Sequence, residues 1–220
     1  MLNLFGKKKI TKLYQDLPPG ERIKKLFEEK LGPFLTQHNF RFIKSKNLFK
    51  RQTGEFTQEI YMAKGKWNRG DEICQFWLIF TIIANDFNSW HQNKYGTLPI
   101  NDIVAGYYHN HLKNWKTEYE LDKYDLSKQD NNKVFQEIEA NIKNLVFPLF
   151  NKFSNYEKSA DTLMEKKEYW QAAKIYDYYI KSGNIDKAKN ALLAGREYFR
   201  TQADPNKQLL EAFELRWNHP

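Results

Sequence analysis

Two histidines and one cysteine have the greatest potential for chemistry in this 220-residue sequence. His109 and His111 flank Asn110, and Cys74 is the single cysteine. The segment is predicted to be helical, and residues two apart on a helix point to different faces, so the two histidines would not meet at one metal ion. Cys74 lies in an apolar stretch, where a cysteine usually packs as a small hydrophobe. We expect no metal site and no cofactor.

Sequence patterns typical of enzymes do not complete a site. Gly65 and Gly70 lack the spacing and the following Lys-Ser/Thr of a phosphate-binding loop, and no Gly-x-Ser-x-Gly elbow occurs. Glu59 and Lys64 form the one acid–lysine pair on a predicted strand, which is weak support for a metal-dependent nuclease. The sequence therefore predicts a protein without catalytic activity.

A basic segment that contains a tryptophan is the candidate nucleic-acid-binding surface. Its members are Lys44, Lys46, Lys50, Arg51, Lys64, Lys66, Trp67 and Arg69. In an antiparallel meander, the turn at 44–46 and the loop at 64–69 would lie at the same end of the sheet. Lysines would contact phosphates and Trp67 would stack on a base. The alternatives are contact with a protein partner, or lysines that only prevent edge-to-edge aggregation.

The formal net charge of +8 is concentrated in one part of the chain. Residues 22–69 carry twelve Lys and Arg against four acidic residues, whereas residues 71–153 have a net charge of −3. A concentrated basic face attracts anionic partners such as nucleic acid or an acidic protein. A solvated basic face without a partner is the alternative interpretation.

The elements expected to position the basic segment are one helix and a set of short strands. Apolar residues recur at helical spacing from Ile23 to His38 and continue through Gly32-Pro33, which predicts a kinked helix or two short ones. Residues 56–63 alternate as a half-buried strand does. Residues 73–84 are apolar on nearly both faces, which predicts a central strand covered by helices.

The order of elements predicts an α+β fold in which a small antiparallel β-meander packs with helices. After the strands we expect a loop over 85–100, a helix over 103–115 and a helix over 134–149. The remaining chain predicts an all-α antiparallel bundle of about four helices. The expected domains are a basic N-terminal segment (1–19), an α+β domain (20–150) and a helical domain (151–220).

The helical domain resembles tetratricopeptide repeats over about residues 159–200. The resemblance rests on Tyr169-Trp170-Gln171-Ala172 and on the stretch from Gly183 to Ala188, although Lys167 stands where the repeat usually has glycine. It implies protein binding, and a helical hairpin that only covers core is the alternative. The tyrosines expected to contact a partner are Tyr169, Tyr176 and Tyr179.

Residues 22–83 resemble an uncharacterised bacterial domain-of-unknown-function family, in which a helix and a loop precede a meander. The residues that carry the likeness include Asn39-Phe40 and Phe49-Lys50-Arg51, and Asn39 replaces a glycine of the family. Asparagine also tolerates left-handed backbone geometry. Some members occur near contact-dependent toxin systems, so the resemblance implies an immunity-type or interaction role and no active site.

Composition sets the expected environment. No apolar run reaches the length of a membrane span, and the single cysteine fits a reducing compartment. We therefore expect a cytoplasmic bacterial protein that does not associate with membranes. The predicted function is a non-enzymatic protein-interaction module, an immunity-type protein or an adaptor, and the alternative is nucleic-acid binding through residues 44–69. The sequence leaves the partner and the oligomeric state open.

Overall fold

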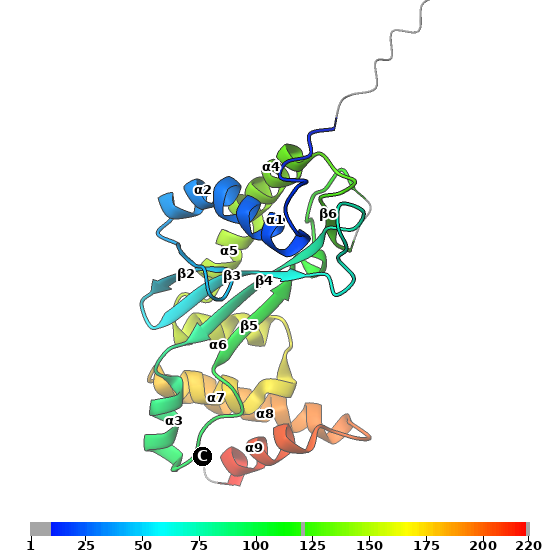
Figure 1. Ribbon diagram of the computed structural model, residues 1–220. Coiled ribbons are helices and arrows are strands. Elements are labelled where there is room, and N and C mark those ends of the chain that lie inside the picture. The colour runs from blue at the N-terminus through cyan, green and yellow to red at the C-terminus, as the bar shows by residue number, and fades with distance from the viewer. Residues whose placement is uncertain (1–9, 120–121, 219–220) are drawn as a thin grey trace, which may run out of the picture. The chain divides into compact units, whose positions relative to one another are not determined.

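The computed structural model describes residues 10–119 and 122–218, and it has an α+β fold (Figure 1). Contacts divide the chain into two compact units that interleave along the sequence. Unit 1 comprises Met1–Gln52, Thr57–Ile82 and Ala105–Pro148, and unit 2 comprises Thr53–Phe56, Ile83–Val104 and Leu149–Pro220. Residues 83–104, which the sequence placed in the first domain, therefore group with the C-terminal helices.

The sheet is the antiparallel meander that the sequence predicts. Its strands are β1 (Arg41–Ile43), β2 (Leu48–Thr53), β3 (Phe56–Lys64), β4 (Gln75–Ala84), β5 (Ile103–Tyr108) and β6 (Tyr124–Asp125). The first five are neighbours in chain order, and β6 pairs with β4. In the β1–β2 pair, Arg41 lies opposite Lys50 and Phe42 lies opposite Phe49. Short connections between sequential strands explain this order.

One face of the sheet is buried and the other is half-exposed. On β3 the buried positions are Phe56, Gln58, Ile60 and Met62, as the predicted alternation requires. On β4 alternate residues such as Phe76 and Leu78 are buried, but the residues between them are only partly covered. The predicted central position of this strand is confirmed, because β4 lies between β3 and β5, and one of its faces is more fully buried than the other.

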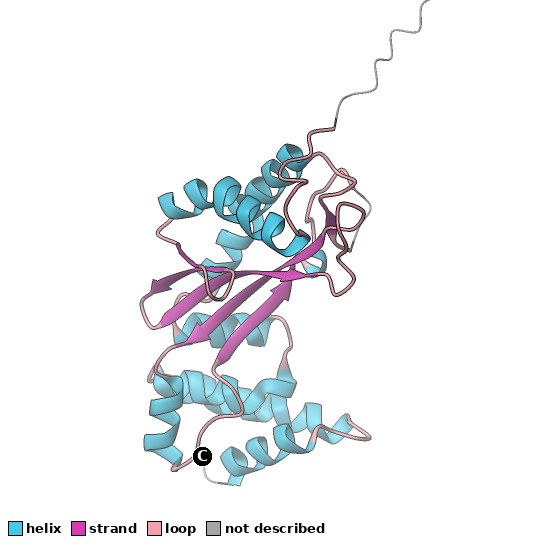
Figure 2. Ribbon diagram, in the orientation of Figure 1, coloured by secondary structure: helices cyan, strands magenta, loops and turns pink. Residues whose placement is uncertain are grey.

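Helices of unit 1 cover one face of the sheet (Figure 2). The first helical segment consists of α1 (Pro19–Leu26), a π-helical turn (Phe27–Leu31) and α2 (Gly32–Gln37). The π-helical turn stands just before Gly32-Pro33, where proline cannot donate to the regular hydrogen-bond ladder, and it accounts for the predicted kink. The Phe27 ring meets that of Phe49 edge-on at 5.2 Å.

A second helical segment of the chain begins at α4 (Asn131–Asn141). It continues through a π-helical turn (Ile142–Val146) into α5 (Phe147–Lys152). The Asp130 side chain caps α4 by accepting a hydrogen bond from the Lys133 amide. This segment agrees with the helix predicted over 134–149.

Two predicted elements are wrong. Residues 85–100, expected to be a loop, contain α3 (Phe87–Tyr95), which ends at Gly96 with a left-handed φ of 72°. The helix expected over 103–115 is instead strand β5, followed by a 3₁₀ turn (His109–His111). A short run of β-branched and aromatic residues satisfies both periodicities, and here the strand preference prevails.

Unit 2 contains the predicted C-terminal helices. They are α6 (Tyr156–Glu165), a 3₁₀ turn (Tyr169–Gln171), α7 (Ala172–Lys181), α8 (Ile185–Thr201) and α9 (Lys207–Asn218). Helix α7 packs against α6, α8 and α9. Gly195 of α8 lies so close to Ala172 of α7 that an added Cβ would sit 2.3 Å from the Ala172 Cβ. Within the described residues, no helix has the length and apolarity needed to cross a membrane.

Candidate binding surface at the basic end of the sheet

Formal charge is distributed very unequally between the two units. Unit 1 contains 22 Lys and Arg residues against 14 Asp and Glu, whereas unit 2 contains 13 of each. The whole net charge of +8 therefore belongs to unit 1. Unit 1 is therefore the part of the chain whose charge favours an anionic partner.

The β1–β2 turn (44–47) and the β3–β4 loop (65–74) lie at the same end of the sheet, which we call the basic end (Figure 1). Strand β2 begins where its neighbour β3 finishes, and the Met62 amide donates to the Asn47 carbonyl at 3.4 Å. Asn47 has a positive φ of 52°, which asparagine tolerates in a tight turn. The two basic segments therefore lie at the same end of the sheet, as the meander predicts.

The β3–β4 loop has a fixed base and an exposed tip. The Asn68 side chain accepts a hydrogen bond from the Gln75 amide at 2.7 Å and donates one to the Gln75 carbonyl at 2.8 Å. The Gly65 amide donates to the same carbonyl. These bonds close the loop while Trp67 stays 76% exposed, with the Lys66 ammonium 5.3 Å from its ring centroid. A large apolar ring held in solvent on a closed loop is unusual, and it indicates a surface that contacts another molecule.

The basic end carries exposed cations together with acidic residues. The exposed cations of the basic end are Lys44, Lys46, Lys64, Lys66 and Arg69. Lys44 pairs with Glu28 at 3.1 Å, and Arg69 pairs with Glu72. The surface is therefore basic overall but mixed in sign.

Arg51 does not belong to this surface. Its guanidinium packs 4.5 Å from the Phe40 ring centroid and 5.2 Å from that of Phe147. It donates to the Gln58 side chain at 2.7 Å and to the His38 carbonyl at 3.0 Å. Burial lowers the pKa of Arg51. The prediction that Arg51 contributes to the basic binding surface is therefore wrong. Arg51 instead helps to pack α2 and α5 against the sheet. Lys50 is half-buried on β2, opposite Arg41 of the edge strand β1.

The three tyrosines expected to contact a partner do not form an exposed face. Tyr176 and Tyr179 are 4% and 3% exposed, and Tyr169 is half-buried in the 3₁₀ turn. Packing of α7 against three helices buries its tyrosines, so their expected exposure is wrong. The Tyr179 hydroxyl donates to Asp161 at 2.7 Å, and burial together with this bond raises its pKa.

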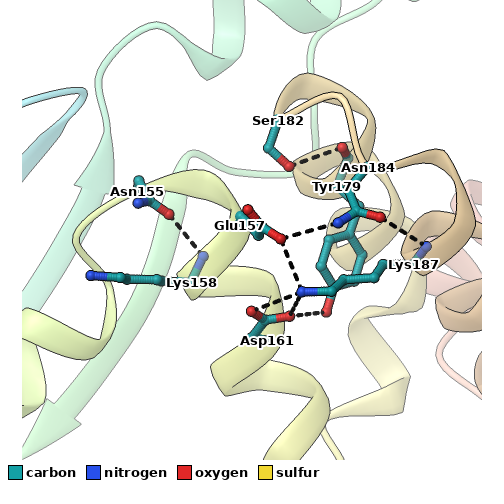
Figure 3. Close-up of polar contacts among 8 residues, drawn as sticks. All are labelled: Asn155, Glu157, Lys158, Asp161, Tyr179, Ser182, Asn184 and Lys187. Atoms are coloured by element: carbon teal, nitrogen blue, oxygen red, sulfur yellow. Dashed lines mark hydrogen bonds and ion pairs between the residues drawn. The ribbon is translucent and has the colours of Figure 1, made fainter.

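The stretch that resembles a repeat signature forms an ionic network around Lys187 (Figure 3). The Lys187 ammonium contacts Glu157 at 2.9 Å and Asp161 at 3.0 Å, both on α6. The Asn184 side chain donates to Glu157 and accepts from the Lys187 amide, so it also caps α8. Hydrogen bonds from Lys187 and Asn184 lower the pKa of Glu157. These groups join α6 to α8 and satisfy one another.

The turns around this network have the backbone geometry of glycine positions. Lys167 has a φ of 57° and Gly183 a φ of 82°. Lys167 thus adopts the left-handed conformation at the position where the repeat usually has glycine. In unit 1, Asn39 behaves likewise, with a φ of 65°. Lys167 and Asn39 therefore both adopt the left-handed conformation that glycine favours.

A buried polar cluster in unit 2 escaped the sequence analysis. Arg216 of α9 donates to Asp177 of α7 at 2.8 Å and 3.2 Å, and its Nη2 lies 2.5 Å from Nε2 of His91 of α3. Tyr95 donates to Asp177 at 2.7 Å, and its ring lies 4.2 Å from the guanidinium. The ring nitrogen Nδ1 of His91 is 2.6 Å from the Thr97 carbonyl, so Nδ1 donates and Nε2 accepts from Arg216. Each of these groups has a partner, which is typical of a structural cluster.

The residues with potential for metal chemistry are dispersed. His109 is buried and accepts a hydrogen bond from the Leu78 amide, whereas His111 is exposed and packs edge-on against Tyr108. Cys74 is buried, which raises its pKa to about 11 and makes it unreactive. Across the described part of the chain, no three His, Cys, Asp or Glu side chains form a group that could hold a metal ion.

Comparisons with known proteins do not add a relative. No protein-family model, curated protein or solved structure gives a significant match to this chain.

Proposed function

We propose that the protein is a non-enzymatic protein-interaction module that binds an acidic surface of a partner protein through the basic end of unit 1. The observation that carries the proposal is Trp67, which is exposed on a closed loop with the Lys66 ammonium beside its ring. Immunity-type and adaptor roles both fall within this proposal, since they differ in the partner and not in the kind of surface.

An aromatic anchor and a charged rim together suit the basic end to binding a protein. Tryptophan and arginine are enriched among the residues that dominate binding energy at protein interfaces. Burying the Trp67 ring in a partner pocket would remove a large apolar surface from water. The Asn68–Gln75 hydrogen bonds hold the loop before binding, which reduces the conformational entropy lost on association. The lysines would increase the rate of encounter with an acidic surface.

The mixed charge of the basic end favours a protein over a polynucleotide. Glu28 and Glu72 pair with Lys44 and Arg69, and Asp71 is exposed on the same loop. A continuous phosphate backbone would be repelled by these carboxylates and would have to compete for the paired cations. A folded partner can instead place its own acidic and basic groups to match.

Nucleic-acid binding is the second candidate, because further aromatic side chains are exposed near the basic end. Tyr61, near the end of β3, is 36% exposed, and Tyr108, the last residue of β5, is 45% exposed. Together with Trp67 they could stack the bases of a single strand. This candidate requires affinity for an oligonucleotide that decreases steeply with salt.

The test is quantitative capture from native lysate of the source cells. Immobilised wild-type protein is compared with Trp67→Ala and with a Lys46→Glu/Lys66→Glu double variant. Lys189→Glu is the matched control, because it reverses an exposed lysine of unit 2. A second arm measures the binding of labelled single-stranded DNA and RNA between 50 and 300 mM salt, salt concentrations on the order of those over which phosphate contacts are lost.

The proposal expects a discrete protein that both basic-end variants lose and that Lys189→Glu keeps, even after nuclease treatment. Capture that is equal for all variants, or no specific capture, contradicts it. Loss of captured material after nuclease treatment, with salt-dependent oligonucleotide binding, replaces it with the second candidate.

A further inference from the structure

We propose that unit 1 contains a separate ligand site, a pocket lined by the connection from β5 to β6 that binds a small planar monocarboxylate. The pocket has a volume of about 490 Å³, and its lining includes His109, Asn110, Trp115, Asp122, Lys123 and Tyr124. This volume is in the range of small-molecule sites. The inference is independent of the proposed protein partner.

Three aromatic rings form a wall of fixed geometry. The His109 and Tyr124 rings stack with centroids 5.2 Å apart, and Trp115 meets His109 at 5.4 Å. The Trp115 indole donates to the Tyr124 hydroxyl at 2.8 Å, and Phe80 supports Trp115 from the sheet at 5.6 Å. Trp115 is only half-buried, so its indole offers the aromatic surface on which a flat ligand can pack, and the buried His109 and Tyr124 rings hold it in place.

His109 supplies a hydrogen-bond donor without an acceptor. It is 2% exposed, and its Nδ1 accepts from the Leu78 amide at 3.3 Å, so the neutral ring carries its proton on Nε2. Burial lowers the pKa of His109 to about 4, which keeps the ring neutral near pH 7. Among the described residues, no hydrogen-bond partner contacts Nε2. A donor in the lining of a pocket can bond to a ligand that supplies an acceptor.

Tyr124 supplies a second donor. Its oxygen already accepts from Trp115, and no acceptor within the described residues takes its own proton. Burial raises the pKa of Tyr124, so the hydroxyl remains protonated. Two donors in one pocket lining call for an acceptor-rich ligand, and a carboxylate offers about four lone-pair sites.

The charged residues at the pocket define the charge of the ligand. The Lys123 ammonium lies 6.0 Å from the Trp77 ring centroid and can attract an anion, while Asp122 is exposed beside it. One cation and one anion favour a monoanion over a dianion or trianion, because Asp122 repels additional negative charge. An aromatic monocarboxylate such as benzoate therefore fits both the wall and the donors.

The experiment is a titration of the full chain with benzoate, followed by two-dimensional NMR of side-chain N–H signals. Benzamide and benzylammonium retain the benzene ring of benzoate, but the first is neutral and the second is positively charged. The variants are Lys123→Gln and Tyr124→Phe, and the matched control is Lys128→Gln, an exposed lysine outside the lining. Thermal unfolding of every variant verifies the fold.

Benzoate should give saturable shifts of the His109 Nε2–H and Trp115 indole signals. Benzamide should bind about tenfold more weakly, and Lys123→Gln and Tyr124→Phe should each weaken benzoate about fivefold, effects on the order of one lost charge-assisted hydrogen bond. Lys128→Gln should bind as the wild type does. Absence of saturation, equal binding of benzylammonium, or unchanged affinity in both folded lining variants would overturn the site.

Discussion

The two units of this chain use a buried arginine in different ways. In unit 2, Arg216 is matched by the carboxylate of Asp177, and unit 2 as a whole carries equal numbers of positive and negative residues. In unit 1, Arg22 is buried and donates to the carbonyls of Leu13 and Leu126 and to the Asn131 side chain, all neutral acceptors.

The comparison shows two uses of charge in one chain. In unit 2, ionic groups pair with one another within the unit, as in the Lys187 network and the Arg216–Asp177 pair. Unit 1 has a net charge of +8, and its basic end exposes several lysines and Trp67. Unit 2 is therefore interpreted as a scaffold with internal polar contacts, and unit 1 as the part available to a partner.

The largest expected effect comes from breaking the buried pair of unit 2. Asp177→Ala leaves the Arg216 guanidinium buried and without its carboxylate, and we expect a loss of about 3–5 kcal/mol in the free energy of unfolding. Chemical denaturation measures it. Replacing both residues, in Asp177→Leu/Arg216→Met, should cost less than Asp177→Ala alone. A broken buried pair is expected to cost at least about 3 kcal/mol. If the free energy of unfolding of Asp177→Ala stays within about 1 kcal/mol of wild type, well below that cost, this cluster does not stabilise unit 2.

A pH dependence is expected from His109 in unit 1. Its pKa is lowered by burial from 6.5 to about 4, so the unfolded chain binds more protons between these values. The contribution of neutral His109 to the free energy of unfolding is fully present above pH 6.5. It decreases as pH falls, and the free energy of unfolding is lower by about 3 kcal/mol at pH 4. The free energy of unfolding of His109→Phe, measured over the same range, should have a correspondingly smaller slope. Equal slopes would contradict burial of a neutral His109.

Gly195→Ala tests the close approach of α7 and α8. Alanine favours a helix by about 1 kcal/mol over glycine. The new Cβ would, however, lie 2.3 Å from Ala172 Cβ and 3.0 Å from Phe213. We expect the overlap to dominate, with a net loss of about 1–3 kcal/mol in thermal or chemical unfolding. A stabilised variant would mean that the helices separate more easily than the structure implies.

The smallest expected effect on stability belongs to Trp67→Ala. The ring is largely exposed, so the free energy of unfolding should stay within about 0.5 kcal/mol of wild type. Partner capture should nevertheless be lost, which separates recognition from folding. A marked decrease in the melting temperature would show that Trp67 packs against the fold instead of serving a partner.

The sequence predicted the meander and the C-terminal helices because their apolar periodicities are long and regular. It failed at β5, where Ile103, Val104, Tyr107 and Tyr108 fit a helical face as well as a strand. The burial of Arg51 had a readable signal, since in a strand it shares a face with Phe49 two residues earlier. The basic residues were grouped by residue type alone, so the strand face that each one occupies was overlooked.

The polar cluster of unit 2 and the pocket of unit 1 had no such signal. His91, Asp177 and Arg216 are far apart in the sequence, and packing of α3, α7 and α9 brings them together. The pocket depends on the stacking of His109 with Tyr124, which followed from β5 being a strand. Neither spacing nor composition reports such tertiary contacts.

The most direct test of the central claim is site-specific photo-cross-linking in the source cells. A photoreactive amino acid is placed at position 67 in unit 1 or, as a matched exposed apolar site, at position 193 in unit 2. The account predicts a discrete protein adduct from position 67 and none from position 193. An adduct from position 193 alone, or none from either position, would contradict it.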